Sequence, residues 1–193
     1  MVPVPVEVIV LNGGSSSGTS TLARRLQALL GPGWLTLGVD DLLRALPGGE
    51  DPVGGPASLT VGPDGSVVVD GDFRRAEAAW YRGLAAMAGA GTGLIVDEVF
   101  LGGRASQDRL AAALAGRTVV WVGVRCAADT AARRERGRPD RVAGMARDQA
   151  ERVHTGVVYD LVVDTTTASA EACAQAVVAH LARSAPRGAA PGT

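Results

Sequence analysis

The sequence predicts a doubly wound α/β fold with a parallel central sheet. Short runs of apolar, β-branched residues alternate with helical patterns along nearly the whole chain, which is typical of parallel strands joined by helices. A glycine-rich turn, Gly13–Gly18, follows the first apolar run and precedes a helical pattern. Strand, turn and helix in this order form the usual surroundings of a phosphate-binding loop.

The first half of the chain supplies two strands, two helices and a hairpin. Val6–Leu11 is a β-branched run and predicts a buried strand. A helix is expected from about Ser20 to Leu30, because leucines recur on one side of it, and Gly31–Gly33 ends it. The following elements are a strand at Trp34–Val39, a short helix from Asp40 to Leu46, a loop at Pro47–Pro56 and a β-hairpin around Pro63-Asp64-Gly65.

The second half continues the alternation. The expected elements are helices at Phe73–Gly89, Ser106–Ala115 and Ser169–Arg183, strands at Gly93–Phe100, Thr118–Val124 and Val157–Thr165, and an arginine-dense helical stretch between Arg125 and His154. A chain of 193 residues predicts one domain. We expect this domain to span residues 1–183, with an insertion at about 47–71, a lid at about 127–141, and a flexible tail at 184–193.

Composition excludes several classes of protein. The net charge of −1 argues against a nucleic-acid binder. No run approaches the roughly 18 apolar residues of a membrane span, and the N-terminus lacks the basic region of a signal peptide. Two cysteines, Cys126 and Cys173, suit a reducing cytosol and suggest no disulfide framework, so a cytoplasmic location is expected. The composition leaves open whether the chain forms a homo-oligomer.

The glycine-rich turn follows the phosphate-loop pattern G-x-x-x-x-G-K-[ST] except at one position. Gly13, Gly18 and Ser20 fit the pattern, but Thr19 stands where lysine is expected. All 19 basic residues are arginine, which indicates either a coding bias or a replacement of lysine chemistry by arginine. The backbone N–H groups of this loop, together with the hydroxyls of Ser15, Ser16 and Ser17, predict a site for phosphate or another anion.

Acidic residues follow two of the predicted strands. Asp40 lies where it could accept a proton from a substrate hydroxyl, although Asp40 or Asp41 could instead only cap the next helix, with Asp41 the more natural cap. Asp97-Glu98 closes an apolar strand, a pattern that holds Mg²⁺ beside a phosphate loop. Ser20 and Asp97 are therefore the expected magnesium ligands.

The segment from residue 133 to 141 carries five arginines in nine residues, interrupted by glycine and proline. Such runs are usually solvated faces, but this one also suits a mobile lid over polyphosphate, which could supply the charge that Thr19 lacks. The two histidines are weaker candidates. His180 is expected on the surface, and His154 could face either the site or the core.

With these features assembled, the chain resembles the chloramphenicol phosphotransferase family over about Val6–Leu181. The resemblance rests on the stretches VLNGGSS (Val10–Ser16), GVDDL (Gly38–Leu42), DEVFLGG (Asp97–Gly103), WVGVRC (Trp121–Cys126), DRVAGMA (Asp140–Ala146) and VHTGVVYDLVVDTT (Val153–Thr166). It implies a P-loop kinase fold and transfer of the γ-phosphoryl group of ATP to a hydroxyl of an antibiotic, a reaction that confers resistance.

The resemblance also implies roles for individual residues. Asp40 matches the general base, and Arg134, Arg138 and Arg141 match arginines of the lid. The nucleotide loop is matched by Gly13, Gly14, Ser15, Ser16, Ser17, Gly18, Thr19 and Ser20. The family loop has lysine where this chain has Thr19, so three hypotheses stand: an ATP- and Mg²⁺-dependent O-phosphotransferase acting on a small hydroxyl compound, a repurposed scaffold acting on a phosphorylated or sulfated metabolite without ATP turnover, and a non-catalytic binder.

Overall fold

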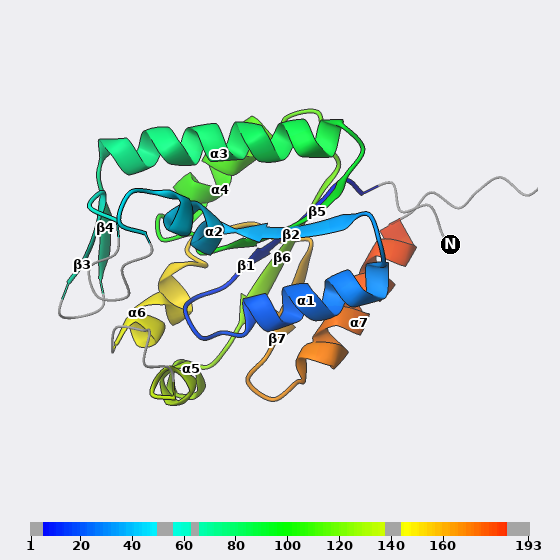
Figure 1. Cartoon of the computed structure of the whole chain (residues 1–193). Helices are drawn as coiled ribbons and strands as arrows, with labels where there is room; N and C mark the ends of the chain where they lie inside the picture. Colours follow the sequence, from blue (N-terminus) through cyan, green and yellow to red (C-terminus); the bar gives the residue numbers. More distant parts are fainter. Residues whose placement is uncertain (1–5, 50–55, 63–65, 138–143, 185–193) are drawn as a thin grey trace, which may run out of the picture.

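The computed structural model confirms the expected parallel α/β architecture (Figure 1). It describes residues 6–49, 56–62, 66–137 and 144–184. Five parallel strands form the sheet in the order β2-β5-β1-β6-β7. Their bounds are β1 Val8–Asn12, β2 Trp34–Gly38, β5 Gly93–Glu98, β6 Val119–Arg125 and β7 Leu161–Asp164.

Helices cover both faces of the sheet, which explains why the central strands are apolar throughout. Every residue of β1 is buried. α1 (Thr19–Leu30) and α7 (Ala170–Ser184) cover one face, and α3 (Gly71–Gly89) and α4 (Arg104–Ala113) cover the other (Figure 1). The protein is therefore a three-layer sandwich with one apolar core on each side of the sheet.

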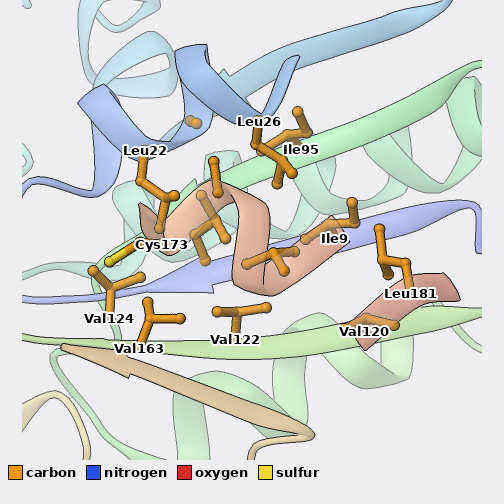
Figure 2. Packing of buried hydrophobic residues seen from close by; sticks show 14 of the residues in the cluster. Ile9, Leu22, Leu26, Ile95, Val120, Val122, Val124, Val163, Cys173 and Leu181 are labelled. Atoms are coloured by element: carbon orange, nitrogen blue, oxygen red, sulfur yellow. The ribbon is translucent and has the colours of Figure 1, made fainter. Parts of the chain in front are cut away.

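The core between α1, α7 and the sheet is built from Leu, Ile, Val and Ala side chains, with one cysteine. Leu22 and Leu26 of α1 are completely buried there, whereas Leu29 on the outer side of the same helix is 45% exposed. Figure 2 shows Leu22 and Leu26 among the strand residues Ile9 and Ile95 and the α7 residue Leu181. The leucine spacing that predicted the helix is thus the spacing that fills the core.

The elements beyond the sandwich gather at one end of the sheet (Figure 1). They are the short helix α2 (Val39–Ala45), the antiparallel hairpin of β3 (Leu59–Val61) and β4 (Val67–Val69), and the helices α5 (Ala128–Glu135) and α6 (Met145–Arg152). The expected hairpin is confirmed, although its turn at residues 63–65 lies outside the described residues. The arginine-dense stretch, expected to be helical, contains the two helices α5 and α6.

One expected strand is shorter in the structure. Val157–Thr165 is predicted as strand, but β7 begins only at Leu161. The backbone of Val158 pairs instead with a side chain, because Gln107 of α4 accepts its N–H at 3.0 Å and donates to its carbonyl at 2.7 Å. A side chain therefore replaces the strand partner at this position.

Among the described helices, none has both the length and the hydropathy that crossing a bilayer requires.

The first prediction concerns the α1 face of the core. Leu26→Ala would leave a cavity under a fully buried side chain, so we expect it to lower the free energy of unfolding by about 2–5 kcal/mol. Leu29→Ala on the outer side of the same helix is the matched control, with an expected change within about 0.5 kcal/mol. Urea unfolding followed by circular dichroism measures both. Equal losses in the two variants would contradict this account of the core.

Candidate active site

The carboxyl ends of three neighbouring strands meet at one edge of the sheet, and the phosphate loop begins there. In the register of the sheet, Leu11 of β1 lies opposite Asp97 of β5, which in turn lies opposite Gly38 of β2. The Gly13 N–H donates to the Glu98 carbonyl at 3.2 Å, which fixes the start of the loop to the end of β5. In open α/β sheets this edge is where ligands bind.

The loop from Gly13 to Ser20 is tightly folded before α1. A Cβ added at Gly13 would lie 2.6 Å from Ser17 Oγ and 2.8 Å from the Val124 carbonyl oxygen, so only glycine fits there. Ser16 adopts φ 60, the left-handed region that non-glycine residues rarely enter. A conformation of this kind persists only where its surroundings enforce it, and it is typical of ligand-binding loops.

Unpartnered donors in the loop favour an anion as its ligand. The hydroxyls of Ser15, Ser16 and Ser17 are buried and have no hydrogen-bond partner among the described residues. The first N–H groups of α1 lack partners within the helix by geometry, and the helix has no acidic residue in its first turn. An anion beside the loop would satisfy these donors, and burying them without one is costly.

Thr19 does not replace the missing lysine with charge. Its side chain is only 7% exposed, and its Cγ2 lies 2.9 Å from where a Cβ on Gly13 would be. Together with Ser20, it lies close enough to Asp97 to lower the pKa of that carboxyl group. The residue at the lysine position therefore points inward and joins two parts of the site.

Asp97 lies at the centre of the site and is suited to a cation. Burial raises the pKa of its carboxyl group. Ser20 and Thr19 oppose this shift and the charges of Asp40 and Asp41 add to it, so that the pKa is about 6. A divalent cation beside this carboxylate would offset the cost of its ionisation. A hydroxyl next to a carboxylate is the arrangement that P-loop proteins use for Mg²⁺, with phosphate and water as the other ligands. No group of three or more His, Cys, Asp or Glu side chains within the described ranges could hold a metal ion unaided.

The two adjacent acids after β2 have different surroundings. Asp41 accepts the Gly38 N–H at 2.8 Å and pairs with Arg44, so it caps α2, as its position predicts. Asp40 is half-buried and lies close enough to Asp97 for its charge to influence that carboxyl group. The capping role therefore falls to Asp41, and the Asp40 carboxylate lies on the side of the loop nearest β2.

A second acidic residue, Glu98, lies behind the site on the opposite face of β5. It is 3% exposed, the Tyr81 hydroxyl donates to its Oε2 at 3.5 Å, and its Oε1 has no described partner. Burial raises the pKa of this carboxyl group to about 8, and the charges of Glu77 and Asp97 act in the same direction. Burial therefore disfavours the ionised form of Glu98.

Arg134 reaches the phosphate loop from α5. Its guanidinium donates to the Thr165 carbonyl at 2.7 Å and to the Ser17 carbonyl at 3.3 Å. It approaches from the β6 and β7 side of the sheet, whereas Asp40 follows β2 at the other end of the strand order. Arg138 and Arg141, the other two expected arginines, lie outside the described residues.

His154, whose position the sequence left open, lies in the core, and His180 is less exposed than the sequence predicts. His154 is 6% exposed, and its Nδ1 lies 2.6 Å from the Tyr159 hydroxyl, which also accepts from Asn12 Nδ2 at 2.6 Å. Asn12 Oδ1 accepts the Phe100 N–H, so this network joins the ends of β1 and β5 to the segment before β7. His154 is thus a buried structural group, and His180 is half-buried on α7.

Two residues that contact the loop escape sequence reasoning. Gln149 Oε1 accepts the Ser15 N–H at 2.8 Å, and the Thr165 hydroxyl lies 2.5 Å from the Ser17 carbonyl. Gln149 lies within a polar helix and Thr165 within a run of threonines, so neither spacing nor composition distinguishes them. Asn12 carried a signal, since it is a polar residue that ends an apolar strand.

The fold and the loop together define a kinase-type enzyme of the P-loop class. A family model described as chloramphenicol phosphotransferase-like protein matches residues 6–182. The chain therefore belongs to the chloramphenicol phosphotransferase-like family, whose members are small-molecule phosphotransferases by description. This confirms the family that the sequence stretches predict.

Individual relatives agree with this family. A protein of Mycobacterium tuberculosis, found in two strains and provisionally named an O-phosphotransferase, is 31% identical over 170 residues, covering 83% of this chain and 75% of its own. Among solved structures, an unliganded sugar kinase from Janibacter shares the fold with a TM-score of 0.69 at 20% identity, covering 92% of this chain and 95% of its own.

Two further kinases show the same fold. A gluconokinase from Sinorhizobium meliloti has a TM-score of 0.63 at 20% identity and covers 93% of each chain. The APS kinase of Mycobacterium tuberculosis, solved with AMPPNP and APS, has a TM-score of 0.57 at 19% identity and covers 92% of this chain and 98% of its own.

The second prediction follows from the buried His154. Burial, followed by the charge of Arg125, lowers its pKa to about 4, whereas an unfolded histidine protonates near pH 6.5. Unfolding therefore takes up a proton between these values, so the free energy of unfolding falls as the pH drops from about 6.5 to 4. His154→Gln keeps an acceptor for the Tyr159 hydroxyl but cannot titrate. The decrease in its free energy of unfolding between about pH 6.5 and 4 should therefore be smaller by up to about 3 kcal/mol.

Urea unfolding at a series of pH values measures this effect. His180→Gln, at the other histidine, is the matched control. If His154→Gln shows the same pH dependence as the unmodified protein, His154 does not contribute to acid destabilisation.

Proposed function

We propose that the protein is a Mg²⁺- and ATP-dependent O-phosphotransferase that acts on a hydroxyl group of an antibiotic or a related metabolite. The observation that carries this proposal is the convergence on Asp97. Asp97 lies in the sheet between the ends of β1 and β2. Both hydroxyl residues that open α1 lie close enough to lower the pKa of its carboxyl group, and Asp40 lies near enough for its charge to raise that pKa. Hydrogen-bond donors for phosphate, a candidate metal ligand and a candidate general base thus lie at one edge of the sheet.

The nucleotide would occupy the loop from Gly13 to Ser20. Its triphosphate would accept from the N–H groups at the start of α1 and from the buried hydroxyls of Ser15, Ser16 and Ser17. The AMPPNP complex of a kinase with the same fold supports a nucleotide as the ligand. Ser20 and Asp97 would hold Mg²⁺, which supplies charge neutralisation for the phosphates when bound.

Asp40 would act as the general base. Its carboxylate would accept the proton of the substrate hydroxyl as the hydroxyl oxygen attacks the γ-phosphorus. The bond from that phosphorus to the bridging oxygen of ADP breaks as the new O–P bond forms. Asp41 is unsuited to this role, because its two carboxylate oxygens bond to Gly38 and Arg44.

Arginine would supply the positive charge that lysine provides elsewhere. Arg134 is already at the loop, and its guanidinium would add charge on the side away from Asp40. We extend the same role to Arg138 and Arg141, in a lid at about residues 127–141 of a single domain spanning 1–183. Arginine remains charged at all relevant pH values and binds phosphate through two N–H groups.

The proposed function extends to the kind of acceptor substrate and to the cellular location of the protein. The family description supports an antibiotic-like acceptor. We propose the insertion at about 47–71 as the region that contacts it. Free, buried Cys126 and Cys173 and the use of ATP suit the cytoplasm.

A second function has one observation in its favour. Thr19 points inward to Asp97 and leaves the loop without a charge of its own. A scaffold of this kind could hold the phosphate or sulfate group of a metabolite and act on it without ATP. The two functions differ in whether binding depends on a nucleoside triphosphate.

The third prediction separates these functions. We expect Mg²⁺-ATP or Mg²⁺-GTP to bind the purified protein with micromolar affinity, and the bare nucleosides to bind far more weakly, because the phosphates make the contacts. Thr19→Lys should then raise triphosphate affinity by about 10- to 100-fold, since it restores a charged hydrogen-bond donor. Isothermal titration calorimetry measures both. Absence of binding at millimolar nucleotide would refute the ATP-dependent function.

The fourth prediction tests the base. Asp40→Asn should reduce the rate of phosphoryl transfer by roughly 10²- to 10⁴-fold with little change in triphosphate affinity, because the amide cannot accept the proton. The neighbouring Asp41→Asn should instead lower thermal stability through loss of the α2 cap and retain most of the rate. The readout is ADP release in a screen of hydroxyl substrates. Unchanged turnover in Asp40→Asn would rule out this mechanism.

A further inference from the structure

The phosphate loop is braced from outside by α6. Gln149 is 3% exposed, and its Oε1 accepts the Ser15 N–H at 2.8 Å. A Cβ added at Gly14 would lie 3.1 Å from the backbone of Gln149, so loop and helix are in direct contact. The amide of Gln149 thus takes up the backbone donor immediately before the left-handed Ser16.

The residue after Ser16 is held from the opposite side. The Ser17 carbonyl lies 2.5 Å from the Thr165 hydroxyl and accepts from Arg134 at 3.3 Å. Ser16, with φ 60, therefore lies between two residues whose backbone groups are bonded to distant parts of the chain. A strained backbone conformation needs such anchors, because a free loop would relax to a more populated region.

The helix that carries Gln149 is itself fixed at both ends. Glu135 of α5 accepts the N–H groups of Gly144 and Ala146 at 2.9 Å and 2.7 Å, where α6 begins. Beyond its other end, the Val153 carbonyl accepts from Asn12 Nδ2 at 2.8 Å. Gln149 is therefore presented to the loop by a helix that is bonded to α5 and to the end of β1.

We propose that Gln149 is a positioning residue that holds the phosphate loop in its anion-binding conformation before any ligand arrives. The proposal rests on the proposed function in one respect, since it takes the loop to be the triphosphate site. In a loop without lysine, the affinity for an anion depends on how many hydrogen-bond donors already point toward its binding position. The order of the loop before binding therefore matters more than in a loop that has the lysine. Gln149 supplies this order and does not touch the substrate.

The fifth prediction tests this ordering in the free protein, without any nucleotide. Gln149→Met keeps the side-chain volume but removes the acceptor of the Ser15 N–H. We expect amide hydrogen exchange at Ser15, resolved by NMR, to become at least about tenfold faster, while amides in β1 and β6 keep their rates. Unchanged exchange at Ser15 in a folded variant would overturn the proposal.

Two further variants complete the test. Gln149→Glu keeps an acceptor, so it should preserve the slow exchange at Ser15 but weaken binding of inorganic tripolyphosphate by at least about tenfold, because it adds a negative charge beside the loop. If Gln149→Met does not fold, Gln149→Asn is measured instead, since its shorter amide cannot reach Ser15, and the same exchange criterion decides. Fast exchange at Ser15 in Gln149→Glu would also count against the proposal.

The matched control is Gln107→Met, which removes another buried glutamine on the α4 face of the sheet. This substitution should accelerate exchange at Val158, because Gln107 accepts the Val158 N–H in the unmodified protein, and it should leave exchange at Ser15 unchanged. If Ser15 accelerates in this variant too, the effect is general and Gln149 has no specific role. Because exchange is read without nucleotide, failure of the protein to bind triphosphate would refute the proposed function and leave this result standing.

Discussion

The structure depends on the pairing of β1 with two parallel neighbours. Every residue of this strand is buried, and each of its edges is bonded to another strand, so its end cannot shift without breaking the core. The loop that follows β1 therefore starts from a fixed position, and the hydrogen bond from the Gly13 N–H to the Glu98 carbonyl attaches this start to β5. The register that buries the strands is thus the same register that brings Asp97 and the turn after Gly38 to the loop.

The glycine-rich loop before α1 is organised without a lysine. Lysine would bring one mobile charge, whereas this loop has buried hydroxyls, helix N–H groups and a backbone shape imposed by contacts from outside. Neutral donors are weaker than a cation, but rigidly held donors need no reorganisation when the anion binds. Thr19 is buried beside Gly13 and close to Asp97, so it packs the start of α1 against the strand that carries the acidic group.

Much of this architecture is predictable from the sequence because it depends on local patterns. Apolar runs located the strands, leucine spacing located α1, and the glycine turn located the loop. The shortened β7 was not predictable, because it depends on a contact between two distant residues, Gln107 and Val158. The same holds for Gln149, whose importance arises only from which helix packs against the loop.

Glu135 joins α5 directly to the start of α6, bridging the chain between residues 137 and 144. This bond fixes the two ends of that interval independently of the sequence within it. Insertions and deletions there would leave both helices, and the loop that rests on α6, where they are. The support that α6 gives to the loop therefore depends on Glu135 and Gln149, and not on the length of the chain between α5 and α6.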